Sequence, residues 1–218
     1  MALKYALFDL DGTLTDPVLG ITNCVMYALE KFGIFPTSRE ELYPYIGPPL
    51  LYSFMHFHHL SAEDAEMAVA YYRERFAVEG WRENQVYDGI PELLQSLQER
   101  GVNLIVATSK PEEFARRILE HFDLAKYVSF VAGSTLDGKR PEKADVVAYV
   151  CDHYPEINAD NTVMVGDRKY DVEGAHSQGL PAVGVLFGYG ERAELESAGA
   201  DDLAVDVDDL RVQLLARI

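Results

Sequence analysis

The sequence predicts an α/β fold with a parallel β-sheet core and an inserted helical segment. In the second half of the chain, short apolar runs alternate with segments in which apolar residues recur at helical spacing, the pattern of βαβ units in a parallel sheet. Between residues 16 and 82 no run resembles a strand. We therefore expect a core of residues 1–15 and 83–218 and a helical domain of residues 16–82.

Local patterns predict the first strand and the helices of the inserted segment. Tyr5–Leu10 is a short apolar run, typical of a buried strand. In Val18–Phe32 the apolar residues recur at helical spacing, and Gly33 supplies a stop signal. Prolines divide the next stretch into short pieces, after which Leu50–His59 and Ala62–Glu79 are predicted to be helices.

Strands and helices then alternate along the rest of the chain. The predicted elements are helix Gly89–Arg100, strand Val102–Ala107, helix Pro111–Phe122, strand Tyr127–Val131, helix Pro141–His153, strand Thr162–Val165, helix Tyr170–Gln178 and strand Ala182–Leu186. In such sheets ligands bind beyond the carboxyl ends of the strands, so functional side chains should directly follow strands.

The composition narrows the class of protein. The chain has 19 basic and 36 acidic residues and a formal net charge of -17, and such a surface repels nucleic acid. No apolar stretch approaches the roughly 20 residues that a membrane-spanning helix needs, and the N-terminus lacks the pattern of a signal peptide. Cys24 and Cys151 are expected to be reduced thiols. These exclusions predict a soluble cytoplasmic protein without nucleic-acid or membrane partners. A monomer and a homodimer both stay open, because the sequence does not indicate the oligomeric state.

The segment Asp9-Leu10-Asp11-Gly12-Thr13 follows the first predicted strand. Two carboxylates at a strand end that are separated by one residue point in roughly the same direction, and their repulsion would raise one of the two pKa values. Bound Mg²⁺ would resolve this conflict because it prefers carboxylate oxygens. A carboxylate at this place could also act as a nucleophile toward phosphorus. The alternative interpretation is a solvated turn, in which Asp and Gly are common.

Three further groups have places suited to a phosphate or a metal. Thr108-Ser109-Lys110 follows a strand at the expected start of a helix, where a hydroxyl and an amide can hold a phosphate oxygen or simply cap the helix. The segment from Gly166 to Asp171 places carboxylates after another strand. These carboxylates could bind a metal ion, or they could form an acidic turn that caps the next helix. Lys143 opens a helix, and the first turn of a helix is an unfavourable place for a cation, which suggests a role at the site. The alternative interpretation is a plain surface lysine. Together these groups favour one phosphate and metal site in an otherwise acidic protein.

In this order, Asp9-x-Asp11-Gly12-Thr13, Thr108-Ser109-Lys110, Lys143 and Gly166-Asp167-x-x-x-Asp171 resemble the four motifs of the haloacid dehalogenase (HAD) superfamily. The helical segment resembles its C1-type cap, and Tyr45-Ile46-Gly47-Pro48-Pro49-Leu50 resembles the substrate loop of phosphoglycolate phosphatase-like members. The resemblance spans nearly the whole chain. It implies a Rossmann-like core and a helical cap that hinges near Asp16 and Trp81–Val86 and closes over the site.

The resemblance also implies a role for each motif residue. Asp9 would be the nucleophile and would hold Mg²⁺ with its other oxygen. Asp11 would be the general acid for the leaving alcohol and then the base that activates water. Thr108 and the amide of Ser109 would bind a phosphoryl oxygen, and Lys143 would neutralise charge on Asp9 and on the transferring phosphoryl group.

The same resemblance assigns the metal to acidic residues. Asp167 would bind Mg²⁺ directly and Asp171 would support the metal or its waters, so the candidate metal residues are Asp9, Asp11, Asp167 and Asp171. Lys139 is an alternative to Lys143 as the site lysine. Lys143 is preferred because it stands at a helix start, where the superfamily places its lysine.

These residues predict a Mg²⁺-dependent phosphatase that hydrolyses a small phosphorylated metabolite through an aspartyl-phosphate intermediate. The dehalogenases of the superfamily lack an aspartate at the position of Asp11, and a phosphonatase would need a cap lysine, for which Lys31 is poorly placed. A β-phosphoglucomutase-like mutase and a non-enzymatic regulator on the same fold remain alternatives. The substrate stays open among phosphoglycolate, a nucleoside 5′-monophosphate and a sugar phosphate.

The helical segment has two further features of interest. His56, His58 and His59 could form a transition-metal cluster, but adjacent histidines face different sides of a helix. Five aromatic residues could line an apolar pocket or pack the core of the segment. They are Tyr43, Tyr45, Tyr52, Phe54 and Phe57.

Overall fold

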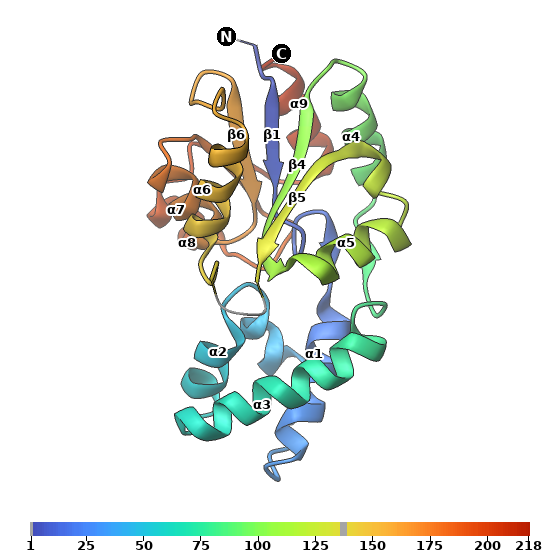
Figure 1. Ribbon diagram of the computed structural model, residues 1–218, viewed down its shortest axis with the longest axis vertical. Coiled ribbons are helices and arrows are strands. Elements are labelled where there is room, and N and C mark those ends of the chain that lie inside the picture. Colours follow the sequence, from blue (N-terminus) through green and yellow to red (C-terminus); the bar gives the residue numbers. More distant parts are fainter. Residues whose placement is uncertain (1, 136–138) are drawn as a thin grey trace. The chain divides into compact units, whose positions relative to one another are not determined.

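A computed structural model of the protein describes residues 2–135 and 139–218 (Figure 1). The chain forms two compact units. The core unit contains the residues up to Asp16 and those from Val86 onwards, and the helical unit is Pro17–Gln85. The sequence-based boundaries, after residues 15 and 82, lie within a few positions of these limits.

The core unit is built on a six-stranded sheet in the order β5-β4-β1-β6-β7-β8, in which each neighbouring pair is parallel. The strands are β1 Tyr5–Phe8, β4 Asn103–Pro111, β5 Val128–Ser134, β6 Thr162–Gly166, β7 Ala182–Val185 and β8 Asp202–Ala204. The predicted α/β fold with a Rossmann-like parallel sheet is therefore confirmed.

Helices cover both faces of this sheet (Figure 1). One side carries α4 Ile90–Gln98, α5 Glu112–His121 and α9 Val207–Leu215, and the other carries α6 Lys143–His153, α7 Lys169–Ser177 and α8 Arg192–Ala198. Every residue of β1 and β6 is buried. Strands that are covered on both faces have no solvent side, which explains why these segments are continuous apolar runs without alternation.

The helical unit contains three α-helices and two irregular turns. They are α1 Val18–Glu30, a 3₁₀ turn at Glu40–Tyr45, α2 Leu50–Phe57, α3 Ala62–Arg75 and a π-helical turn at Phe76–Gly80. Tyr45 and Phe54 are buried with their ring centroids 5.1 Å apart, whereas Tyr43 and Tyr52 are exposed. The aromatic residues therefore divide between the interior of this unit and its surface.

The structure also contains elements that the sequence patterns do not predict. The short strands β2 Thr15–Asp16 and β3 Gln85–Val86 form a two-stranded sheet, and α8, β8 and α9 follow the last predicted strand. Strand β4 continues to Pro111, four residues beyond its predicted end. No helix in the described part of the chain is long and apolar enough to cross a membrane.

Candidate active site

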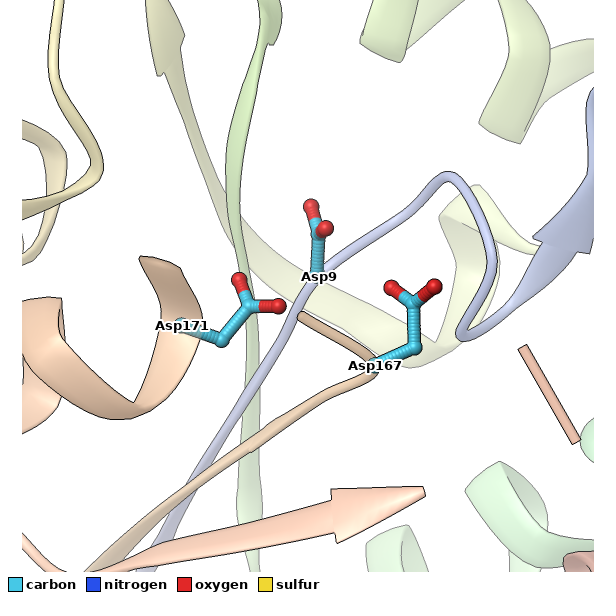
Figure 2. Close-up of side chains that lie close together, drawn as sticks. All are labelled: Asp9, Asp167 and Asp171. Carbon is cyan, nitrogen blue, oxygen red and sulfur yellow. The ribbon is translucent and has the colours of Figure 1, made fainter. Parts of the chain in front are cut away.

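Three acidic side chains meet where two adjacent strands end (Figure 2). Asp9 follows β1, Asp167 follows β6, and these strands pair with each other from Tyr5↔Thr162 to Phe8↔Val165. Asp171 lies in the first turn of α7. All three residues are buried, and one carboxylate oxygen from each lies within 4.8 Å of the others. Asp9 and Asp167 therefore lie directly after strands, where the sequence patterns placed candidate side chains.

Lys143 is the first residue of α6 and contacts two of these carboxylates. Its Nζ lies 2.9 Å from Asp9 Oδ1 and 2.7 Å from Asp171 Oδ1, and it donates a hydrogen bond of 3.0 Å to the Ala107 carbonyl. Burial by itself would lower the pKa of Lys143, but the charges of Asp171 and Asp9 outweigh it and raise that pKa. The ammonium group is therefore fixed and charged. Lys139, the alternative lysine, is exposed.

Asp167 is held by the loop that follows β7. The amide of Tyr189 donates a hydrogen bond of 2.8 Å to Asp167 Oδ2. The chain passes so close that a methyl group on Gly188 would lie 2.4 Å from the Asp167 Cβ, and one on Gly190 would lie 1.8 Å from its carbonyl oxygen. Gly12, at φ +86°, approaches the Asp167 carboxylate in the same way. Glycine is required here because any side chain would displace Asp167.

Burial and mutual repulsion act strongly on these carboxyl groups. Burial raises the pKa of Asp167 well above its usual value, and the charges of Asp171 and Asp9 add to this effect. Burial likewise raises the pKa of Asp171 to about 6, despite the opposing charge of Lys143. Burial is the largest cause of both shifts and the neighbouring carboxylates add to it, so a cation bound here would favour the ionised forms of these groups.

The donor set fits a divalent cation. Four carboxylates, those of Asp9, Asp11, Asp167 and Asp171, stand against two buried ammonium groups, Lys143 and Lys110, which leaves a formal excess of two negative charges. Asp11 Oδ1 is buried and has no hydrogen-bond partner among the described residues. Hard divalent cations prefer carboxylate oxygens, so Asp9, Asp167 and Asp171 could together hold such an ion.

Asp11 lies apart from the other three carboxylates. The group of potential metal ligands contains Asp9, Asp167 and Asp171 but not Asp11. Instead, Asp11 Oδ2 forms an ion pair with Lys110 Nζ. From the sequence, Lys110 had no predicted role beyond its place in the Thr108-Ser109-Lys110 motif. Its position two residues after a predicted phosphate-binding hydroxyl was the only sequence signal, and its burial became visible only in the structure.

The sequence patterns placed Thr108 and Ser109 at the start of a helix, and the structure shows that this is wrong. They lie inside β4, and α5 begins only at Glu112. Thr108 is buried, and its Oγ1 accepts a hydrogen bond of 3.2 Å from the Lys110 amide; Ser109 is half-buried. An extended strand end, rather than a helix N-terminus, therefore presents the Thr108 hydroxyl.

The three histidines of the helical unit do not form a metal cluster. Helix α2 ends at Phe57, so His58 and His59 lie beyond it. His58 Nδ1 is 2.7 Å from the Tyr45 hydroxyl, and the His56 ring stacks on Tyr52. Within the described residues, no group of potential metal ligands includes a histidine.

A buried carboxylate cluster and a lysine at the carboxyl edge of a parallel sheet form a site that could hold a divalent cation and a phosphate group together. Comparison with known proteins agrees. Residues 6–185 match the family model described as haloacid dehalogenase-like hydrolase. The chain therefore belongs to the haloacid dehalogenase-like hydrolase family, as the motifs implied, and it is a phosphoric monoester hydrolase.

Individual relatives are similar over nearly the whole chain. A 5′-nucleotidase of Pseudomonas aeruginosa is 44% identical over 96% of this chain and 96% of its own length. The tyrosine-protein kinase PtkA of Mycobacterium tuberculosis is 38% identical over 97% of this chain and 72% of its own. A crystal structure of a predicted phosphatase from Clostridium acetobutylicum has a TM-score of 0.95 and 46% identity, covering 99% of this chain and 100% of that one. Curated phosphoglycolate phosphatases also match, at lower identity.

Proposed function

We propose that this protein is a Mg²⁺-dependent phosphatase that hydrolyses nucleoside 5′-monophosphates through an aspartyl-phosphate on Asp9. The observation that carries the proposal is the contact of Lys143 Nζ with Asp9 Oδ1 beside the acidic cluster. It gives one carboxylate a fixed cation of the kind that a nucleophile needs when a phosphate dianion approaches it. The substrate class is supported by the similarity to a 5′-nucleotidase over almost the full length of both chains.

The first step breaks the ester bond. A carboxylate oxygen of Asp9 forms a bond to phosphorus while the bond from phosphorus to the ester oxygen breaks, and Asp11 gives its proton to the departing nucleoside oxygen. Burial raises the pKa of Asp11, although the charge of Lys110 opposes it, which favours a carboxyl group able to donate a proton. Lys143 compensates charge at Asp9, and the Thr108 hydroxyl with the Ser109 amide binds phosphoryl oxygens.

The second step releases phosphate. Asp11, now a carboxylate, takes a proton from water while the water oxygen bonds to phosphorus and the bond to Asp9 breaks. Inorganic phosphate leaves, and both aspartates return to their starting protonation states. Mg²⁺ held by Asp9, Asp167 and Asp171 would supply positive charge that stabilises the negative charge on the phosphoryl oxygens.

The test measures phosphate release from nucleoside 5′-monophosphates, phosphoglycolate and β-glucose 1-phosphate, with Mg²⁺ or with EDTA. We compare the wild type with Asp9→Asn and with Asp160→Asn, which changes an exposed aspartate. We expect release that needs Mg²⁺, that is lost in Asp9→Asn and that persists in Asp160→Asn. We also expect acid-quenched wild type to carry covalent phosphate from labelled substrate.

Each arm of this test separates one part of the proposal. Activity in Asp9→Asn within about tenfold of wild type would reject Asp9 as nucleophile, since losing a nucleophile costs far more. A preference for phosphoglycolate would keep the mechanism and replace the substrate. Conversion of β-glucose 1-phosphate to an isomeric phosphate would favour the mutase alternative, and no turnover of any substrate would favour the regulator.

A further inference from the structure

Asp11 is held by a second buried lysine, distinct from the one at Asp9. The Nζ of Lys110 forms an ion pair with Asp11 Oδ2, and the two side chains are only 6% and 13% exposed. Lys143 contacts Asp9 and Asp171. The two lysines therefore serve different carboxylates. A lysine is costly to bury, so the position of Lys110 calls for a reason.

A bulge in β4 places Lys110 at this position. In the pairing of β4 with β5, Thr108 is opposite Gly133 but Pro111 is opposite Ser134, so Ser109 and Lys110 are extra residues on β4. Bulges beside active sites redirect side chains. Here the redirected side chain is that of Lys110, which reaches Asp11 beyond the end of the neighbouring strand β1.

The backbone of Lys110 is fixed at three points. Its amide donates to Thr108 Oγ1 at 3.2 Å. Its carbonyl oxygen lies where a methyl group on Gly133 would be only 2.6 Å away. The following Pro111 restricts Lys110 to extended conformations. A backbone held in this way fixes the point from which the side chain of Lys110 extends, and the ion pair with Asp11 holds its ammonium end.

The two oxygens of Asp11 have different surroundings. Oδ2 is occupied by Lys110, whereas Oδ1 is buried and has no hydrogen-bond partner among the described residues. We propose that Lys110 is a positioning residue that holds Asp11 by Oδ2, so that Oδ1 is presented to the oxygen that receives or gives the proton. This inference rests on the proposed function, in which Asp11 is the acid and base, and it assigns one lysine to the nucleophile and the other to proton transfer.

The inference predicts a dependence on the leaving group. An alkyl leaving group, such as the 5′-oxygen of a nucleoside, needs the proton from Asp11, whereas the p-nitrophenolate ion leaves without one. We therefore measure kcat/KM for a nucleoside 5′-monophosphate and for p-nitrophenyl phosphate with one preparation of each variant. The ratio of the two values does not depend on the fraction of protein that is folded and active.

For Lys110→Met we expect the ratio of alkyl to aryl kcat/KM to fall by about tenfold or more, a part of the 10² to 10⁴ that general acid catalysis typically contributes. Lys110→Arg should restore part of the ratio because a guanidinium group can still form an ion pair with Asp11 Oδ2. The matched control, Lys139→Met, changes an exposed lysine and should leave the ratio unchanged. A second measurement follows the early time course with p-nitrophenyl phosphate, in which Lys110→Met should show a burst of nitrophenolate because phosphoenzyme hydrolysis also needs Asp11.

Two results would overturn the assignment. An unchanged ratio without a burst would mean that Lys110 has no part in proton transfer. An equal rise of KM for both substrates at unchanged kcat would make Lys110 a phosphate-binding residue instead. Failure of the proposed function has a different signature, because wild type and Asp9→Asn would then release phosphate alike, before any variant of Lys110 is considered.

Discussion

Replacing Lys143 by methionine should strongly destabilise the metal-free protein. The change removes ion pairs of 2.9 and 2.7 Å to Asp9 and Asp171 and a hydrogen bond of 3.0 Å to the Ala107 carbonyl. Methionine fills the volume of the aliphatic part of the side chain, so the loss is mainly electrostatic. Removing one partner from a buried ion pair typically costs about 3 to 5 kcal/mol, and we expect a loss of that size in the free energy of unfolding.

The pH dependence of this loss has a definite sign. The folded-state pKa of Asp171 is already raised to about 6, and without Lys143 it should rise further. A carboxyl group whose folded-state pKa is raised lowers stability as pH rises from its unfolded pKa to its folded pKa, so in wild type this loss is complete above about pH 6, whereas in the variant it continues to higher pH. The deficit of Lys143→Met relative to wild type should therefore grow between pH 5 and pH 8, on the order of kcal/mol.

Urea unfolding in EDTA, followed by far-UV circular dichroism at both pH values, measures the deficit. Lys139→Met is the matched control, since substitutions on the surface usually change stability by less than about 0.5 kcal/mol. A deficit below about 1 kcal/mol at pH 8 would refute the reasoning, because a buried cation paired with two carboxylates cannot be so cheaply removed.

Three further predictions concern the metal site, a glycine that packs against it, and one surface carboxylate. Mg²⁺ at about 100 times its Kd should stabilise the wild type by about 2.7 kcal/mol, seen as a higher Tm by calorimetry, and Asp167→Asn should abolish most of this shift. Gly188→Ala should cost about 1 to 3 kcal/mol by overpacking against Asp167 and should weaken the Mg²⁺ shift. The control is Gly33→Ala, in which the added methyl has no atom within 4 Å but the backbone has φ +70°, so it should lose stability and keep the Mg²⁺ shift. Equal Mg²⁺ shifts in Gly188→Ala and Gly33→Ala would contradict the prediction. A third prediction concerns Asp201, which lies away from the site. Burial raises the pKa of Asp201, but the hydrogen bond that it accepts from the Ala182 amide contributes to a net lowering of this pKa. Its stabilising contribution is present above the unfolded pKa and should be lost as pH falls through the lower folded pKa, so urea titrations of Asp201→Asn and wild type should converge as the solution is acidified through that range.

The sequence predicted the fold class because its signals are local. A buried parallel strand such as β6 has to be apolar on both faces, and the helices between strands keep their own periodicity. The acidic residues of the site were found for a related reason. Parallel strands bring their carboxyl ends to one edge, so Asp9 and Asp167 could be placed together without knowledge of side-chain contacts.

Other features depend on contacts between distant segments. The bulge at Ser109 and Lys110 exists only through the pairing of β4 with β5, and no pattern within β4 reveals it. The approach of Gly188 to Asp167 depends on the adjacency of β6 and β7. Helix α8 and strand β8 are too short to produce a clear periodicity. The roles of the site residues and the domain boundaries remain predictions.

The position of β1 in the sheet has a consequence for biosynthesis. This strand lies between β4 and β6, and its first partner residue, Asn103 for Tyr5, follows only after the helical unit. At translation rates of about 5 to 20 residues per second, the apolar β1 waits about 5 to 20 s for its first neighbour. The whole helical unit is synthesised in this interval while the strand that precedes Asp9 is still unpaired, so the nascent chain carries an apolar strand with two open edges until β4 follows.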